Sequence, residues 1–359
     1  MPIDFSVERW KKVKQNSREW WDGKLGRPLI CITLGGRPPA RAEPKKTGVP
    51  WSKMAYDLSF AADEIVDLWD YQLSGLEFLG DSFPAVWPNF GAGVLAAFMG
   101  AKADPAEETV WFHPDKHREP DDIRFSITPD NIWLKRIKDI CRVAMARWAG
   151  LVQVGMTDLG GNLDVISSFR PGEKLLLDLV DYPDEAKRLT WEEHAMWWKA
   201  FEEINSVLKP INPGYTAWTP IFSETPYYML QCDFAYMIGP DMFDEFVKPE
   251  LAASCKRLDH AFYHLDGIGQ LPHLDSLLAI KELKGVQWVP GAGQPHCKHW
   301  PDVYRKIIKA GKRAQFIDSW REFDALVEQV GGAENFIIFG GARQDERHEV
   351  EAFLKRYEQ

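Results

Sequence analysis

Short apolar segments alternate along the chain with longer segments whose apolar residues recur every three or four positions. In one long segment Trp197, Phe201 and Leu208 share a helical face, and Pro183 marks the start of that helix. Apolar runs of strand length are typical of strands buried on both faces. The segments predicted as strands are residues 29–34, 76–79, 151–156, 215–218, 261–265, 286–289, 314–317 and 336–339.

This alternation predicts a parallel sheet covered by helices. Seven or eight repeats favour an α/β fold of the (β/α)₈ TIM-barrel type over an open doubly wound sheet. No glycine-rich dinucleotide fingerprint follows the first strand, which further disfavours the open alternative. We expect residues 1–359 to form a single domain, with N-terminal helical additions and a loop over about residues 1–56. Residues 102–128 are expected to form a small insertion, a hairpin over one rim.

Composition and charge indicate which kinds of molecule the protein is not expected to bind. The formal net charge of −10 makes a nucleic-acid partner unexpected, because phosphate binding needs a basic surface. Residues 1–14 lack the apolar core of a signal peptide, and the longest nearly apolar stretch, residues 90–101, is too short to cross a bilayer. We therefore expect a cytoplasmic protein without a membrane partner. The five scattered cysteines do not form a disulfide framework.

Polar residues gather where the predicted strands end. Asp81 and Asp158 each follow a strand, and in a barrel the carboxyl ends of all strands converge on one face. We therefore expect both to be catalytic and to face one cavity, with a helix N-cap as the alternative role for each. The substrate is expected to contact further residues near these ends and in the glycine-containing loop 157–164, namely Arg37, Gly160, Gly161, Asn162, Arg170, Trp218, Gln287 and Trp288.

Two features support these binding residues. Adjacent glycines at Gly160 and Gly161 allow a close approach of the backbone to a ligand or to the next helix. Arg170 is placed to neutralise a carboxylate, with a structural ion pair as the alternative. The sequence also contains 16 tryptophans, and some of these rings are expected to wall a pocket for a flat or apolar ligand.

His264 and Asp266 alternate along a predicted strand, so their side chains point to the same face. Such a pair can act as an oriented acid–base pair, or it can contribute two ligands to a metal site. A metal site needs a third protein ligand, and the candidates are Glu224, Asp233 and Asp318. A hydrogen-bonded pair without a metal is the alternative.

Six of these segments together resemble the uroporphyrinogen-decarboxylase-like superfamily, which includes the heme-pathway decarboxylase and cobalamin-linked methyltransferases. The resemblance covers roughly residues 69–339 and implies a (β/α)₈ barrel. The segments that carry it are 79–84 (LGDSFP), 91–95 (GAGVL), 157–164 (TDLGGNLD), 232–238 (CDFAYMI), 263–267 (YHLDG) and 287–293 (QWVPGAG).

Departures from the family pattern weigh against two of its activities. Ser168 and Gly341 stand where the decarboxylase has a tyrosine and a histidine. The family's zinc methyltransferases hold their metal with a His-x-Cys pair and a later cysteine. Here His264 keeps the histidine, Asp266 replaces the thiolate, and no later cysteine is present at the matching position.

The resemblance favours a small-molecule methyltransferase or demethylase as the leading hypothesis. His264 and Asp266 would protonate or polarise the leaving heteroatom, and Asp81, Asp158 and Arg170 would orient the substrate. A corrinoid would be carried by a partner protein, and a divalent metal such as zinc is left open, as is a homodimer. One alternative is a decarboxylase of a porphyrinogen or another small carboxylic acid, with Arg37 and Arg170 holding carboxylates. The other is a non-catalytic binding barrel.

Overall fold

Seven strands form the central sheet of the computed structural model, which describes residues 2–358. The strand order is β2-β1-β11-β10-β9-β8-β7, and every neighbouring pair is parallel except β1 and β2. The strands are β1 (Leu29–Gly35), β2 (Glu77–Gly80), β7 (Tyr227–Gln231), β8 (His260–Asp266), β9 (Leu283–Val289), β10 (Arg313–Phe316) and β11 (Phe336–Arg343).

A second, very short sheet continues the same wall. β3 (Ala85–Val86) pairs in parallel with β6 (Gln153–Val154), and the backbone N–H of Met156 donates to Thr216 (2.9 Å). Within residues 2–358, no strand pairing joins this piece to β2 or to β7. The molecule is therefore a mixed α/β fold with a parallel central sheet, and the closed eight-stranded barrel expected from the sequence is not shown.

The sheet does not close into a barrel because two of the segments predicted as parallel strands take other conformations or directions. The segment 215–218 turns back on itself, because Tyr215 and Ser223 exchange backbone hydrogen bonds of 2.7 and 3.0 Å. The segment 76–79 does form β2, but β2 runs antiparallel to β1. The insertion behaves as expected, since β4 (Lys102–Pro105) and β5 (Val110–His113) form an antiparallel hairpin.

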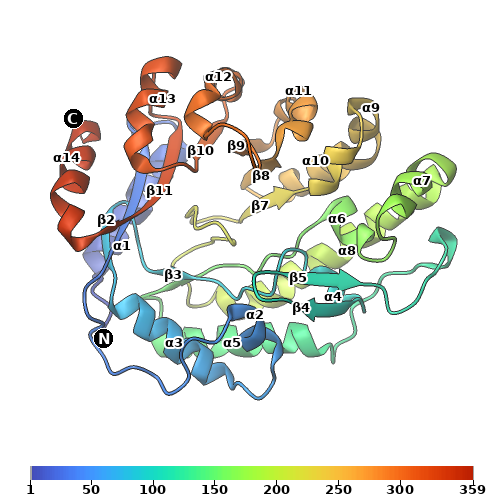
Figure 1. Ribbon diagram of the computed structural model, residues 1–359, viewed down its shortest axis with the longest axis horizontal. Helices are drawn as coiled ribbons and strands as arrows, with labels where there is room; N and C mark the ends of the chain where they lie inside the picture. The colour runs from blue at the N-terminus through green and yellow to red at the C-terminus, as the bar shows by residue number, and fades with distance from the viewer. Residues whose placement is uncertain (1, 359) are drawn as a thin grey trace.

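Helices surround the strands in chain order, as the colour sequence from α3 to α14 in Figure 1 shows. Their apolar faces pack on the sheet, as the buried Trp197, Phe201 and Leu208 of α8 illustrate. Across residues 2–358, no helix has the length and apolarity required to cross a membrane. The helices are α1 (Val7–Trp21), α2 (Trp51–Tyr56), α3 (Ala62–Ser74), α4 (Leu95–Phe98), α5 (Ile132–Trp148), α6 (Asn162–Ser167), α7 (Glu173–Asp181), α8 (Pro183–Leu208), α9 (Pro240–Met242), α10 (Lys248–Arg257), α11 (Leu274–Leu278), α12 (Pro301–Lys309), α13 (Phe323–Val330) and α14 (Arg347–Tyr357).

The N-terminal helix α1 covers the ends at which the parallel strands begin. Trp21 stacks on His260, the first residue of β8, with ring centroids 4.1 Å apart. The indole N–H of Trp10 donates to the backbone oxygen of Leu151 (2.9 Å), just before β6. The expected N-terminal helical addition is thus confirmed, and it leaves the opposite ends of the strands free.

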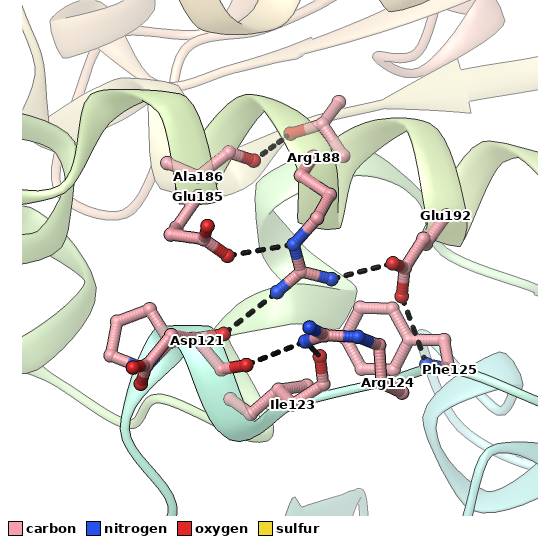
Figure 2. A network of polar contacts seen from close by, with 10 residues as sticks. Asp121, Ile123, Arg124, Phe125, Glu185, Ala186, Arg188 and Glu192 are labelled. Atoms are coloured by element: carbon pink, nitrogen blue, oxygen red, sulfur yellow. Dashed lines mark hydrogen bonds and ion pairs between the residues drawn. The ribbon is translucent and has the colours of Figure 1, made fainter.

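Arg188 and Glu192 of α8 form ion pairs within the helix and hydrogen bonds to the backbone of the segment after the hairpin (Figure 2). Arg188 donates to Glu185 (2.7 Å), to Glu192 (2.5 Å) and to the backbone oxygen of Pro120 (2.8 Å). Glu192 in turn accepts the backbone N–H of Phe125 (3.2 Å). The insertion is therefore fixed to the helical layer by contacts that leave the sheet interior untouched.

Packing within the sheet leads to one prediction about stability. Gly285 of β9 lies against the buried ring of Phe262, and a Cβ added there would stand 2.1 Å from a ring carbon. We expect Gly285→Ala to lower the free energy of unfolding by about 1–3 kcal/mol, because a well-packed core cannot take the extra volume. Gly341→Ala in β11 is the matched control, since a Cβ there meets nothing within 4 Å. Equal unfolding midpoints for the two variants in urea would contradict this packing.

Candidate functional site

Three side chains converge where β7 and β8 end. The ligand atoms of Asp233, His264 and Asp266 all lie within 4.8 Å of one another. His264 Nε2 is 3.9 Å from Asp266 Oδ2, which confirms that the alternating pair shares one face. Asp233 comes from the next strand, as the first residue of the short 3₁₀ helix η2 (Asp233–Met237) after β7. Of the three candidates for a third ligand, the fold thus selects Asp233.

The orientation of the His264 ring is fixed by the neighbouring strands. Its Nδ1 contacts the Oε1 atom of Gln287, whose amide nitrogen donates to Gln315 (2.8 Å). Because an amide oxygen only accepts, Nδ1 is the donor, and Nε2 is left facing the acidic residues. The ring of Trp218 stands edge-on to His264, with centroids 5.3 Å apart. Gln287 and Trp218, two of the residues predicted to contact the substrate, therefore lie beside His264.

A cavity of about 440 Å³ opens beside this cluster. Asp164 lines it, and its carboxylate accepts the backbone N–H groups of Asp233 (2.8 Å) and Phe234 (2.7 Å). These two bonds hold the start of η2 in place and so position Asp233. The lining residues are Ala92, Gly93, Asp164, Ser167, Ser168, Gln231, Asp233, Phe234, Tyr236 and Met237.

The carboxyl groups around the cavity resist ionisation. Burial raises the pKa of Asp158 to about 7, and the negative charge of Asp233 raises it further. The hydrogen bond from the backbone N–H of Gly160 acts in the opposite direction and lowers this pKa. Burial likewise raises the pKa of Asp164 to about 8, again with a contribution from Asp233. Both values lie near neutrality, where a proton or a cation can change the charge state of the site.

The acidic residues of the site have almost no basic ion-pair partners among residues 2–358. Burial raises the pKa of Asp233, His264 opposes that shift and Asp266 reinforces it. Among residues 2–358, no lysine or arginine forms an ion pair with Asp158, Asp164, Asp233 or Asp266, and the His264–Asp266 contact is their only one with a basic group. The charge of these carboxyl groups is therefore not balanced by a lysine or arginine of the described residues, and burial favours their neutral forms.

A second cavity, of about 400 Å³, borders β1 and β11. Its polar features include the hydroxyl groups of Thr33 and Ser82, which lie 3.2 Å apart and bond to each other. Most of the remaining lining is apolar and comprises Cys31, Leu73, Leu76, Phe78, Phe83, Ala85, Pro220, Phe339 and Gly340.

The glycines of loop 157–164 serve the packing of that loop. Gly160 has a φ of +69°, and a Cβ there would stand 2.6 Å from the Cα of Gly93. Gly160 is thus required for contact with the segment that lines the cavity. Gly161 meets its surroundings at ordinary distances of 3.8 Å or more. Asn162 points away from the cavity, since its amide donates to Glu250 (2.8 Å), so its predicted contact with the substrate is corrected.

Three further residues that were expected to contact the substrate are engaged by other parts of the protein or are fully buried. The guanidinium of Arg170 is engaged by both oxygens of Asp178 (2.5 and 2.6 Å), so the structural ion pair holds and no substrate carboxylate is needed. Arg37 binds the backbone oxygen of Ser74 (3.4 Å) at the periphery. Trp288 is fully buried, because its side chain points to the opposite face from that of Gln287.

Asp81 also lies elsewhere, which corrects the expectation that it faces the same cavity as Asp158. Its carboxylate accepts from Arg27 (2.7 and 3.0 Å), from Asn16 (2.7 Å) and from the backbone N–H of Ile30 (3.0 Å). Ile30 stands near the beginning of β1. Because β2 is antiparallel, its end lies by the start of β1 and away from the ends of the parallel strands.

Sequence reasoning missed Gln231 and Asp164 as site residues. The residues of β7, YYMLQ, form an apolar run that was not assigned to a strand, although Gln231 and Asp233 repeat the spacing of His264 and Asp266. Asp164 lies in the loop already singled out, but only its contacts to η2 identify its position.

The environment of Asp81 predicts a structural role. Asp81→Asn should lower the free energy of unfolding by about 2–4 kcal/mol, because a buried carboxylate with an arginine partner is lost. The same change at Asp158 should cost far less, since no lysine or arginine of residues 2–358 forms an ion pair with it. Urea denaturation at pH 7 measures both effects, and an equal loss in the two variants would contradict the assignment.

Raised pKa values also predict how stability depends on pH. Between about pH 4 and pH 8 the folded protein holds protons on Asp158 and Asp164 that the unfolded chain has released. Stability should therefore fall as the pH rises through this window, by at most about 1.4 kcal/mol per pH unit for each group. Asp158→Asn should flatten the profile measured by urea denaturation from pH 5 to pH 8. A profile as steep as that of the wild type would show that Asp158 titrates normally.

The fold is similar to that of a known protein. Over 97% of this chain and 99% of the other, it matches the structure of a methyltransferase from Methanosarcina mazei, with 13% sequence identity and a TM-score of 0.59. At this identity the likeness shows a shared fold. Comparisons with protein-family models and with curated proteins give no match.

Proposed function

We propose that this chain is a small-molecule methyltransferase or demethylase of the corrinoid-linked kind found among uroporphyrinogen-decarboxylase-like barrels. The observation that carries the proposal is the convergence of Asp233, His264 and Asp266 beside a cavity at the ends of parallel strands. The resemblance places the metal-binding His-x-Cys pair of the family's methyltransferases at His264 and Asp266. The shared fold with a methyltransferase supports the same class of reaction.

The three residues fit a divalent metal ion. One imidazole nitrogen and two carboxylate oxygens suit zinc, manganese or iron, and they leave coordination positions for a substrate. The bond from Nδ1 of His264 to Gln287 fixes the ring, as a hydrogen bond at the second ring nitrogen does in metal-bound histidines. When bound, such a metal supplies a Lewis acid that accepts electron density from a substrate heteroatom.

The rest of the site positions the reacting group. In methyl transfer the bond between the methyl carbon and the heteroatom breaks, and its electron pair stays on the heteroatom. The reduced corrinoid of a partner protein would donate the pair that forms the new bond. Trp218 closes one side of His264, and Asp164 holds Asp233 through the backbone of η2. Tyr236, Met237 and Ile268 are exposed near the site and would meet that partner.

The decarboxylase alternative has less support. It required Arg37 and Arg170 to hold carboxylates, yet both guanidinium groups are engaged elsewhere. The described lining of the cavity instead contains the carboxyl groups of Asp164 and Asp233 and no lysine or arginine that could hold a substrate carboxylate. A non-catalytic binding protein would keep the cavity without methyl transfer, and the two experiments below separate it from an enzyme.

Metal analysis tests the centre of the site. Protein purified without chelator should contain about one equivalent of a divalent transition metal, and His264→Ala or Asp266→Asn should remove most of it. Asp259→Asn is the matched control, because Asp259 is an exposed acid just before the other end of β8. Less than about a tenth of an equivalent in fully active protein would exclude the metal.

Methyl transfer itself can be followed by the absorbance of free cob(I)alamin in the presence of methylated amines and ethers. We expect wild-type protein to accelerate methylation, with a rate at least about 100-fold lower for Asp266→Asn and unchanged for Asp259→Asn. Metal binding without acceleration for any donor would favour the non-catalytic alternative.

A further inference from the structure

Two carboxyl groups close to the three-residue cluster, those of Asp158 and Asp164, have no lysine or arginine partner within residues 2–358. Asp164 and Asp233 line the cavity, Asp266 lies beside Asp233 in the three-residue cluster, and Asp158 is near enough to Asp233 for their charges to interact. No lysine or arginine of residues 2–358 forms an ion pair with any of these four acids. A divalent cation at the three-residue cluster would leave Asp158 and Asp164 with backbone N–H partners and without a cation. A second positive group would therefore be favoured electrostatically beside the metal centre.

Gln231 is the second, independent sign of a ligand. Its side chain is 6% exposed and lines the cavity, on the face shared with His264 in the neighbouring strand. Within residues 2–358, its amide group makes no hydrogen bond. The amide atoms are not enclosed by protein, so they are free to bond to a molecule that enters the cavity. The empty hydrogen-bonding capacity points into the cavity.

Aromatic and sulfur-containing side chains form the outer part of the same cavity. Tyr236, Phe234 and Met237 all line it. The ring of Tyr236 is held in place by the turn at Gly267 and Gly269, where an added Cβ would stand 2.9 and 2.6 Å from ring carbons. Ring faces attract cations, and ammonium-binding sites combine such rings with carboxylates. The lining thus suits a positively charged group with apolar substituents.

We propose that this cavity is a subsite for an ammonium group of the substrate, bound by Asp164, Gln231 and the ring of Tyr236. The inference rests on the proposed function, since the same molecule would present its methylated heteroatom to Asp233, His264 and Asp266. It narrows the substrate class to small methylated compounds that carry a positive charge. Carboxylic acids and uncharged aryl ethers are excluded as preferred substrates.

Isothermal titration with choline and with its uncharged carbon isostere, dimethylbutanol, tests the subsite without any methyl transfer. Choline should bind the purified protein at least about tenfold more tightly, because the two probes differ in charge alone. Gln231→Met and Tyr236→Leu should each weaken choline binding about threefold or more, and Asp164→Asn should do the same. Asp259→Asn should leave it unchanged.

The outcomes separate this proposal from the proposed function. Three outcomes would overturn the ammonium subsite. They are equal affinities for the two probes, no binding of either probe, and wild-type affinity for choline in both Gln231→Met and Tyr236→Leu. Demethylation of an uncharged ether by a protein that ignores choline would overturn the subsite and retain methyl transfer. Selective choline binding without methyl transfer from any donor would retain the subsite and overturn the enzyme.

Discussion

In-register parallel pairing of β7, β8, β9 and β10 is the constraint on which the site depends. The register sets Gln231, His264, Gln287 and Gln315 side by side on one face of the sheet. A slip of one residue would turn each of these side chains to the opposite face, because side chains alternate along a strand. The hydrogen bonds from His264 to Gln287 and on to Gln315 report that register directly and give the imidazole a single orientation.

The buried ionisable residues fall into two groups, those with ion-pair partners and those without. Asp81 and Arg170 have complete sets of partners and stabilise the fold at places remote from the cluster. Asp158 is buried and Asp164 is half-buried, and neither forms an ion pair with a lysine or arginine of residues 2–358. Their pKa values near neutrality lower the stability of the folded state at high pH. A protein retains such groups at a cost to stability, and a bound cation would offset that cost.

Closure of the sheet is interrupted at a place that matters for the site. The segment 215–223 folds back as a hairpin and presents Trp218 to His264. A regular strand at this position would have completed more of the wall. The turn lacks the hydrogen bonds that a strand here would form with its neighbours, and it places the ring of Trp218 against His264. Pro220 of the same turn lines the second cavity.

The sequence alone determined the α/β alternation, most strands of the central sheet, the hairpin insertion and the shared face of His264 and Asp266, because these depend on local periodicity. It also supplied Asp158, Trp218 and Gln287. Only the tertiary structure decided that β2 is antiparallel and takes Asp81 away, that Asp178 occupies Arg170, and that Asp233 is the third member of the cluster. Strand direction and the choice between competing partners depend on contacts between residues far apart in the chain, and periodicity carries no information about those contacts.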